Sequence, residues 1–357
     1  MKKSGKGKPI MLRKIKDSFF QLLFTLLALY LTFLLLRYPA RSLDYACTGL
    51  ILWFRKMIPT LLPFMILSGI MVRMNLTEGF SRFFHPVFHK IWGTSPNGSY
   101  VILMGMLCGF PMGARVIGEL CQAGKLSEKE GAYLLSFCNN IGPIYFLSFV
   151  MSTLSLSGNY LPFLIMYGVP LGYGALLHLF GWPETRQKMR FYTLGWPFTT
   201  AYAPVAPDSF HAAASSRPFR AASMPGEKSV PQRPSLLASI DDSVVSGLIG
   251  IGKLGGYMIF FNLLNILLMP FSSLPDGFLS LCNCLLEITS GISRAGKGHF
   301  YMILTLLPFG GFSCMAQTYS MIKGTGLSIG HYFLHKCIQT ALTGLIYVFF
   351  FVSSSGL

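Results

Sequence analysis

Residues Leu107 to Gln122 read Leu-Cys-Gly-Phe-Pro-Met-Gly-Ala-Arg-Val-Ile-Gly-Glu-Leu-Cys-Gln, and they lie among long apolar segments. Gly109, Pro111 and Gly113 are unsuited to a continuous membrane-spanning helix, because proline removes a backbone hydrogen bond and glycine lowers helix propensity. A weaker copy of the stretch runs from Phe309 to Gln317, near the end of the chain. Two broken apolar segments at corresponding places in two halves of a chain indicate a transporter site.

The composition is typical of a polytopic membrane protein. Of the 357 residues, 52% are hydrophobic and 12% are charged, whereas soluble domains average about 25% charged residues. The net charge of +16 is concentrated in the N-terminus and one loop. That distribution fits the positive-inside rule, and we find no nucleic-acid-binding module. We therefore expect the lipid bilayer and a small-molecule solute as partners, and no nucleic acid; a homo-oligomer is left open.

The sequence lacks the motifs of an enzyme or a metal site. Most of the 8 cysteines lie in apolar segments, where a thiol packs as a small hydrophobe. Cys282 and Cys284 form C-x-C rather than the C-x-x-C of a redox or zinc site. Walker A, G-x-S-x-G and H-E-x-x-H motifs are missing, as is a dinucleotide-binding fingerprint in a strand context. We expect neither a pump nor an enzyme, and no bound cofactor or metal.

The first 42 residues predict a basic cytoplasmic tail and a first transmembrane helix. Residues 1–16 hold seven lysines and arginines and no acid, and residues 18–36 are apolar. Such a run is long enough for a bilayer core, which takes about 20 residues. Its apolar core is longer than that of a signal peptide and no A-x-A cleavage site follows, so we expect an uncleaved helix in the cell membrane.

Residues 43–182 predict the first repeat half with an extra helix. The apolar part before Gly109 is too short to cross, so Tyr100–Cys121 is expected to form a re-entrant hairpin with its tip near Gly109–Gly113. Ser127 and Glu130 form a capping box for the next helix. The other expected elements are an interfacial amphipathic helix (43–56), a spanning helix (57–73), a basic surface helix (78–92), a helix interrupted at Asn139–Pro143 (131–152) and a spanning helix (160–182).

A linker rich in proline, serine and basic residues, 183–243, separates this half from the second repeat half, 244–357. There we expect a spanning helix (244–269), a short piece containing Glu287 (277–293), a second hairpin (300–323) and a last spanning helix (330–352). An offset of 202 aligns Gly109-Phe110 with Gly311-Phe312 and Arg115 with Gln317. The odd number of crossings between the copies predicts an inverted repeat. The alternative is two glycine-rich helical hairpins that pack closely.

Several motifs resemble the YlbJ-type sporulation integral membrane proteins, within the nucleoside-recognition Gate group. They are Pro59-x-x-x-Pro63-Phe64, Gly109–Arg115, Leu126-Ser127, Ser136–Pro143 and Leu286-Glu287-Ile288-Thr289-x-Gly291. The resemblance covers roughly residues 45–350 and implies an architecture similar to concentrative nucleoside transporters. It also implies a small-solute permease or gate needed in spore formation. The identity of the solute does not transfer with it.

Two charged residues are the leading site candidates, because ionisable groups at membrane depth usually serve function. Arg115 would neutralise an anionic solute group, or would pair with Glu119 four residues on. Glu287 would couple a proton or cation, or would hydrogen-bond the broken backbone of a neighbouring hairpin.

Polar residues at the breaks would read the solute or satisfy freed backbone groups. The full set of expected substrate-binding residues is Gly109, Phe110, Pro111, Gly113, Arg115, Asn139, Asn140, Gly142, Pro143, Glu287, Thr289, Gly311, Ser313 and Gln317. The i, i+4 pairs His85/His89 and His331/His335 are expected to be interfacial rather than metal ligands, because no carboxylate or cysteine completes either set.

These features favour a sporulation-associated transporter or gate for a small metabolite. From the family association, an anionic solute such as dipicolinate or a nucleoside-like solute is expected. One alternative is a non-transporting membrane scaffold for the spore envelope, with loop 183–243 as its working surface. A weaker alternative is a metal-ion permease that uses the histidine pairs.

Overall fold

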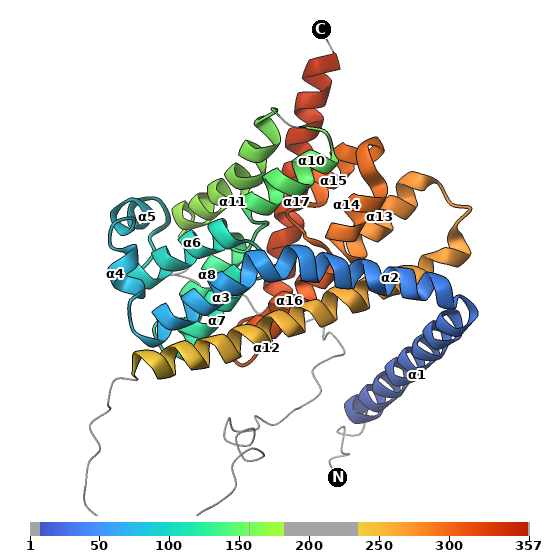
Figure 1. The fold of residues 1–357 in the computed structure, drawn as a ribbon, viewed down its shortest axis with the longest axis horizontal. Coiled ribbons are helices and arrows are strands. Elements are labelled where there is room, and N and C mark those ends of the chain that lie inside the picture. Colours follow the sequence, from blue (N-terminus) through green and yellow to red (C-terminus); the bar gives the residue numbers. More distant parts are fainter. Residues whose placement is uncertain (1–7, 157, 182–234, 356–357) are drawn as a thin grey trace, which may run out of the picture. The chain divides into compact units, whose positions relative to one another are not determined.

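The computed structural model describes residues 8–156, 158–181 and 235–355. All regular secondary structure in this part of the chain is helical (Figure 1). The described residues include 6 helical stretches that are long and apolar enough to cross a membrane. They are Ser18–Arg37, Pro39–Arg73, Leu161–Leu179, Leu236–Phe271, Ile288–Ile322 and Ile329–Phe350. The prediction of an all-α polytopic membrane protein is confirmed.

The N-terminal helix α1, Lys8–Arg37, contains the first predicted span and is described by itself, because residues 1–32 belong to a separate unit of the chain. Its apolar side chains from Phe19 to Leu36 are largely exposed, as expected of a surface that meets lipid. The predicted linker over 183–243 lies outside the described residues up to position 234. Its end was predicted wrongly, because residues 236–243 form the start of a long helix, Leu236–Leu263. The second unit begins at Phe33 and contains the remaining described helices.

One long helix replaces two predicted elements near the start of that unit. Helix α2, Pro39–Leu52, continues through a π-helical turn, Trp53–Met57, into α3, Ile58–Arg73. It packs along α12, Leu236–Leu263, with Trp53 donating its indole N–H to the Ile251 carbonyl at 2.8 Å. A Cβ on Gly49 would lie only 2.9 Å from the Ile259 Cα. The helix predicted over 43–56 is therefore not separate from the next one but continues into α3. Its place at the membrane interface stays a prediction.

The first hairpin joins α6, Pro96–Cys108, to α7, Met112–Gln122, and lies where the sequence predicts it. Gly109 has a φ of 84°, and Phe110–Pro111 is a cis peptide bond. A side chain at Gly109 would be strained at that angle, which explains the glycine at the turn. Two short helices, α4 (Thr77–Ser81) and α5 (His85–Trp92), precede the hairpin.

An interrupted crossing follows the first hairpin. Helix α8, Glu128–Phe137, ends before residues 138–142, and the chain resumes as α9 (Pro143–Tyr145), a π-helical turn (Phe146–Val150) and α10 (Met151–Thr153). This crossing runs antiparallel to α11, Leu161–Leu179. The Tyr133 hydroxyl donates to the Gly174 carbonyl at 2.9 Å, and the Tyr167 hydroxyl donates to the Ile141 carbonyl at 2.8 Å. The predicted interruption at Asn139–Pro143 is confirmed.

Helix α12 leads through a 3₁₀ turn, Leu264–Phe271, to a second hairpin. This hairpin joins α13, Asp276–Leu286, to α14, Ile288–Ala295, and turns at Glu287. A Cβ on Gly291 would lie 2.6 Å from the Cys284 Cα, so the two helices need a glycine at their closest approach. The short piece predicted over 277–293 therefore folds back on itself instead of crossing.

The segment predicted as the second hairpin, 300–323, is a broken crossing, so that prediction is wrong. It consists of α15, Phe300–Leu306, and α16, Gly311–Ile322, and follows a 3₁₀ turn, Gly296–His299. Its rings pack in antiparallel order along α17, Ile329–Ser355: Tyr301 on Tyr347 at 6.3 Å and Phe309 on Phe333 at 5.8 Å. Gly310 and Gly311, with φ of 74° and 82°, interrupt the helix without reversing it.

Each half of the second unit therefore contains a hairpin, a broken crossing and a full crossing, in that order. The offset of 202 aligned the turn of the first hairpin with the break in the broken crossing of the second half, because both positions carry Gly-Phe. In the structure the turn and the break touch within each half. A Cβ on Gly109 would lie 2.3 Å from the Gly142 nitrogen, and a Cβ on Gly311 would lie 3.0 Å from the Cys284 carbonyl.

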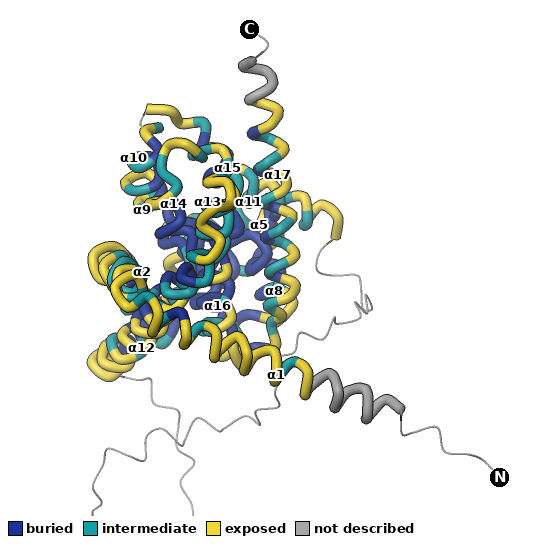
Figure 2. Tube along the Cα trace, turned by 90° about the vertical axis from the view of Figure 1, so that its right-hand side faces the viewer, coloured by how far each residue is buried: buried dark blue, intermediate teal, exposed yellow. Residues whose placement is uncertain are grey.

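The two hairpins enter from opposite ends of this unit. Near the end of α16, the amide of Gln122 in α7 donates to the Lys323 carbonyl at 3.3 Å. Near the start of the same crossing, His299 lies 3.6 Å from where a Cβ on Gly277 in α13 would stand. Buried residues gather where the hairpins meet, around α14 and α16 (Figure 2). This arrangement agrees with the predicted inverted topology.

Candidate functional site

The two hairpins and the two breaks surround a small cavity. A Cβ on Gly310 would stand 3.1 Å from the ring of Phe110, so the turn of the first hairpin touches the break of the second half. The cavity has a volume of about 70 Å³, enough for a few water molecules at ~10–15 Å³ each. Its polar wall is formed by Gly142, Tyr145, Glu287, Thr289 and Gln317, and its apolar wall includes Phe64, Phe110, Ile141, Leu254 and Met258.

Glu287 places a carboxylate on the cavity wall while only 2% of its surface is exposed. It occupies the N-terminal cap of α14, where Oε1 accepts from the Thr289 N–H at 3.1 Å and Oε2 accepts from the Ser290 N–H at 2.7 Å. These bonds satisfy two backbone donors that the hairpin turn leaves free. Glu287 therefore bonds the backbone of its own hairpin and not that of a neighbouring hairpin, as the alternative predicted. Its position on the cavity wall is compatible with the functional role.

Asn262 of α12 lies behind that carboxylate. Its amide donates to Glu287 Oε2 at 3.4 Å and to the Met258 carbonyl at 2.9 Å. Its own Oδ1 is buried and has no hydrogen-bond donor among the described residues. Buried acceptors are usually paired, so the Glu287 region has capacity to accept a further donor.

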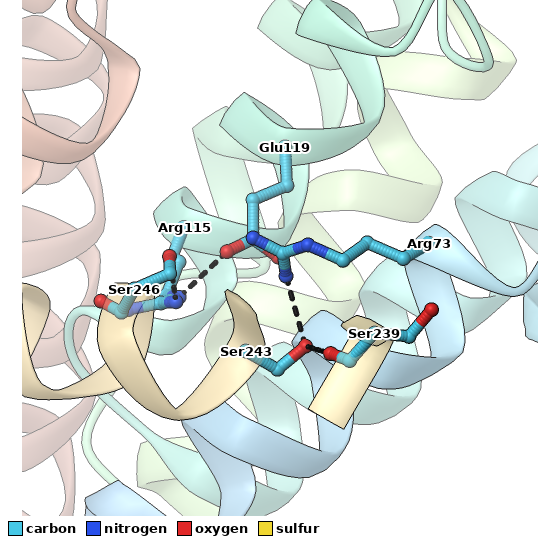
Figure 3. Close-up of polar contacts among 6 residues, drawn as sticks. All are labelled: Arg73, Arg115, Glu119, Ser239, Ser243 and Ser246. Carbon is cyan, nitrogen blue, oxygen red and sulfur yellow. Dashed lines mark hydrogen bonds and ion pairs between the residues drawn. The ribbon is translucent and has the colours of Figure 1, made fainter. Parts of the chain in front are cut away.

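Arg115 lies in a polar cluster between α7 and α12, away from the cavity lining (Figure 3). Its Nε donates to Glu119 Oε1 at 2.8 Å, and a terminal amino group donates to Ser246 Oγ at 3.0 Å. Nearby, Arg73 donates to Ser243 Oγ at 2.9 Å, which joins α3 to α12. Of the two roles predicted for Arg115, the structure contains the ion pair with Glu119.

Asn139 and Asn140 lie at the first break, and both are completely buried. Asn139 accepts from the Ala114 N–H at 3.3 Å and donates to Thr318 Oγ1 at 3.0 Å and to the Tyr332 hydroxyl at 2.9 Å. It therefore ties the first hairpin to the broken crossing and last helix of the second half.

The remaining predicted residues divide into lining and packing positions. Gln317 lines the cavity and donates to Ser313 Oγ at 3.0 Å. Gly113 is a packing position, since a Cβ there would lie 2.5 Å from the Cys138 carbonyl. Pro111, Pro143 and Gly311 shape the turn and the breaks and are likewise not part of the cavity lining.

Comparison with known proteins finds one matching family model and a similar curated protein. Residues 54–157 match the model of the Gate family, described as nucleoside recognition. The chain is 24% identical over 343 residues to the sporulation integral membrane protein YlbJ of Bacillus subtilis (strain 168), covering 87% of this chain and 78% of the relative. The resemblance to YlbJ-type proteins is thus confirmed. No solved structure gives a match, so a likeness to concentrative nucleoside transporters stays a prediction.

The Gate match covers α3, the first hairpin and the first broken crossing. It therefore includes Phe110, Ile141, Gly142 and Tyr145 of the cavity wall. Glu287, Thr289 and Gln317, which come from the second half, lie outside it. A complete cavity needs both halves of this YlbJ-like chain.

His85, His89 and His335 of the two predicted pairs have polar contacts within the protein. His85 Nδ1 lies 3.0 Å from Ser99 Oγ, and His89 Nδ1 lies 3.1 Å from the Thr94 carbonyl. His335 Nδ1 lies 2.7 Å from the Tyr173 hydroxyl. Within the described ranges, no group of three or more His, Cys, Asp or Glu side chains could hold a metal ion.

Sequence reasoning did not select Lys336, which directly follows His335 near the start of the last helix. Lys336 is completely buried, and its Nζ donates to Asn140 Oδ1 at 2.7 Å and to Gln339 Oε1 at 3.1 Å. The spacing of Tyr332, Lys336 and Gln339 could have revealed it, because residues three and four apart share one helix face. A lysine and a glutamine on the tyrosine-bearing face indicate an inward polar stripe.

Proposed function

We propose that this chain is a membrane transporter or gate that passes a small solute through the cavity where its two hairpins meet. The observation that carries the proposal is that hairpins from opposite ends converge on one cavity with a carboxylate in its wall. Discontinuous helices at the interface of an inverted repeat are where secondary transporters bind their solutes.

The breaks provide both flexibility and binding groups. Backbone that leaves the helical pattern is tolerated at membrane depth only when it contacts protein or lines a cavity. Here Gly142 and Glu287 line the cavity, as does Gln317. Alternating access would follow from movement of one hairpin against the other half.

The proposed solute is a small metabolite, either anionic, with dipicolinate as one example, or nucleoside-like. A cavity of about 70 Å³ must widen to hold such a molecule, since pockets for ligands of that kind measure about 300–1,000 Å³. A membrane role in sporulation is supported by the similarity to the Bacillus subtilis protein, which is described as a sporulation integral membrane protein.

Uptake into proteoliposomes that contain the full chain tests the proposal, with radiolabelled dipicolinate and uridine as probes. Thr289→Val and Gln317→Leu remove polar groups from the cavity wall, and Gln122→Leu is the matched control on the exposed end of α7. We expect the wall variants to reduce uptake and the control to retain it. Absence of uptake of both probes by the wild type would exclude transport of these solute classes.

The scaffold alternative is distinguished by deleting residues 183–234, within the linker. A transporter with a plain linker should keep solute uptake after this deletion. Loss of spore formation with uptake intact would instead favour the scaffold.

A further inference from the structure

Lys336 is a buried cation next to the proposed solute path, and the function described so far gives it no role. It lies in α17, two turns from the start, and none of its surface is exposed. The groups that hold it are neutral: Asn140 from the first break and Gln339 from its own helix. The Gln339 amide in turn donates to the Ser136 carbonyl at 2.6 Å, and this bond connects α17 to α8 beside Lys336.

No acidic side chain among the described residues forms an ion pair with Lys336. Among the described residues, Glu119 forms its ion pair with Arg115. Glu287 accepts hydrogen bonds from two backbone amides and an asparagine instead. A buried charge without a counter-charge is strongly destabilising, and intramembrane charges generally mark solute or ion paths.

The ring of Phe110 separates Lys336 from the cavity. Nζ lies 5.3 Å from the centroid of this ring and 5.7 Å from that of Tyr332, so two aromatic rings lie within cation–π distance of the ammonium. Phe110 also lines the cavity and forms the turn of the first hairpin. A movement of that turn would therefore connect Lys336 to the cavity.

We propose that Lys336 is the charge-selecting residue of the transporter: when the Phe110 turn moves aside, its ammonium pairs with a carboxylate of the solute. This inference rests on the proposed transport function. It assigns the counter-charge to Lys336 rather than Arg115, because Glu119 already neutralises Arg115. Lysine is suited to this role because its ammonium is a compact point charge with three donors, of which two meet amide oxygens here.

The test compares two probes of similar shape in proteoliposomes, dipicolinate and its uncharged analogue pyridine-2,6-dicarboxamide. The ratio of their uptake rates cancels the amount of active protein. We expect Lys336→Met to lower the dicarboxylate-to-dicarboxamide ratio about tenfold or more, which corresponds to the loss of about 1.4 kcal/mol of preference. Lys336→Arg should retain part of the ratio. Lys253→Met, an exposed lysine of α12, is the matched control and should leave the ratio unchanged.

A second measurement on the wild type covers the case in which Lys336→Met does not fold. Dipicolinate should slow chemical acylation of Lys336, read by peptide mass, and the dicarboxamide should not. A wild type that takes up neither probe overturns the transport proposal and this inference with it. Uptake of dipicolinate with an unchanged ratio in Lys336→Met, or without protection of Lys336, overturns the inference alone.

Discussion

At the residue scale, buried polar side chains connect the two halves through a small number of hydrogen bonds. Asn139 reaches Thr318 and Tyr332, and Asn140 accepts from Lys336. All three partners lie far from the two asparagines in the sequence, so each bond depends on the correct packing of the hairpins. Removing one partner of a buried polar pair costs more than the bond itself contributes, because the other partner stays buried and unsatisfied.

Glu287→Gln should weaken both the second hairpin and solute uptake. The glutamine side chain keeps one acceptor oxygen. Its NH₂ group, however, faces one of the two backbone N–H groups that donate to the carboxylate in the wild type. We expect a loss of about 1–2 kcal/mol of stability, the range for a helix N-cap, measured as a lower unfolding temperature in detergent. Asp276→Asn, at the exposed start of α13, is the control and should change little. Unchanged unfolding and uptake in Glu287→Gln would refute both roles.

Arg115→Ala should act on stability, since its partners are Glu119 and Ser246 and it does not line the cavity. The loss is expected to be about 2–3 kcal/mol, as for hydrogen bonds to charged groups. The double variant Arg115→Ala, Glu119→Ala should lose less than the sum of the two single variants, because both members of the pair are then removed. A double-mutant cycle of unfolding free energies measures this coupling. Strictly additive losses would show that the pair contributes nothing.

At the element scale, glycines set the distance between helices of the first half. A Cβ on Gly105 of α6 would lie 2.0 Å from the Cys138 carbonyl at the first break, a distance that real Cβ atoms do not reach. A Cβ on Gly252 of α12 would have no atom within 4 Å. These two helical glycines therefore form a matched pair for testing the contact between hairpin and break.

Gly105→Ala should destabilise the first hairpin and reduce uptake, because the break must move away to make room. Gly252→Ala should be neutral or stabilising by up to about 1 kcal/mol, since alanine has the higher helix propensity. Unfolding temperatures in detergent and uptake rates compare the two. Equal effects of the two substitutions would contradict the close contact between α6 and residues 138–142.

At the scale of the whole molecule, the inverted arrangement predicts which positions share a side of the membrane. In a cysteine-free background, Ala123→Cys and Lys323→Cys should react with an impermeant thiol reagent from one side. Ser273→Cys and Ser293→Cys should react from the other side, because they lie beside the opposite ends of the crossings. Labelling of all four positions from one side would exclude the inversion. The experiment also determines the orientation in the membrane.

The sequence by itself determined the membrane class, the first hairpin and the break at Asn139–Pro143. Each depends on local properties: apolar length, the backbone effects of glycine and proline, and polar residues in apolar surroundings. Sequence reasoning also selected Phe110, Gly142, Glu287, Thr289 and Gln317, which the structure brings to one cavity. It placed the second hairpin one element too late, because Gly-Phe occurs both at a turn and at a break.

Only the tertiary structure decided how those local features combine. The turn at Glu287 depends on the close approach of Gly291 to Cys284, and the partner of Arg115 depends on the position of α12. Lys336 was not selected from the sequence, where it follows His331 and His335 near a helix start. Its burial follows from long-range packing against Asn140 and Phe110, which no local pattern encodes.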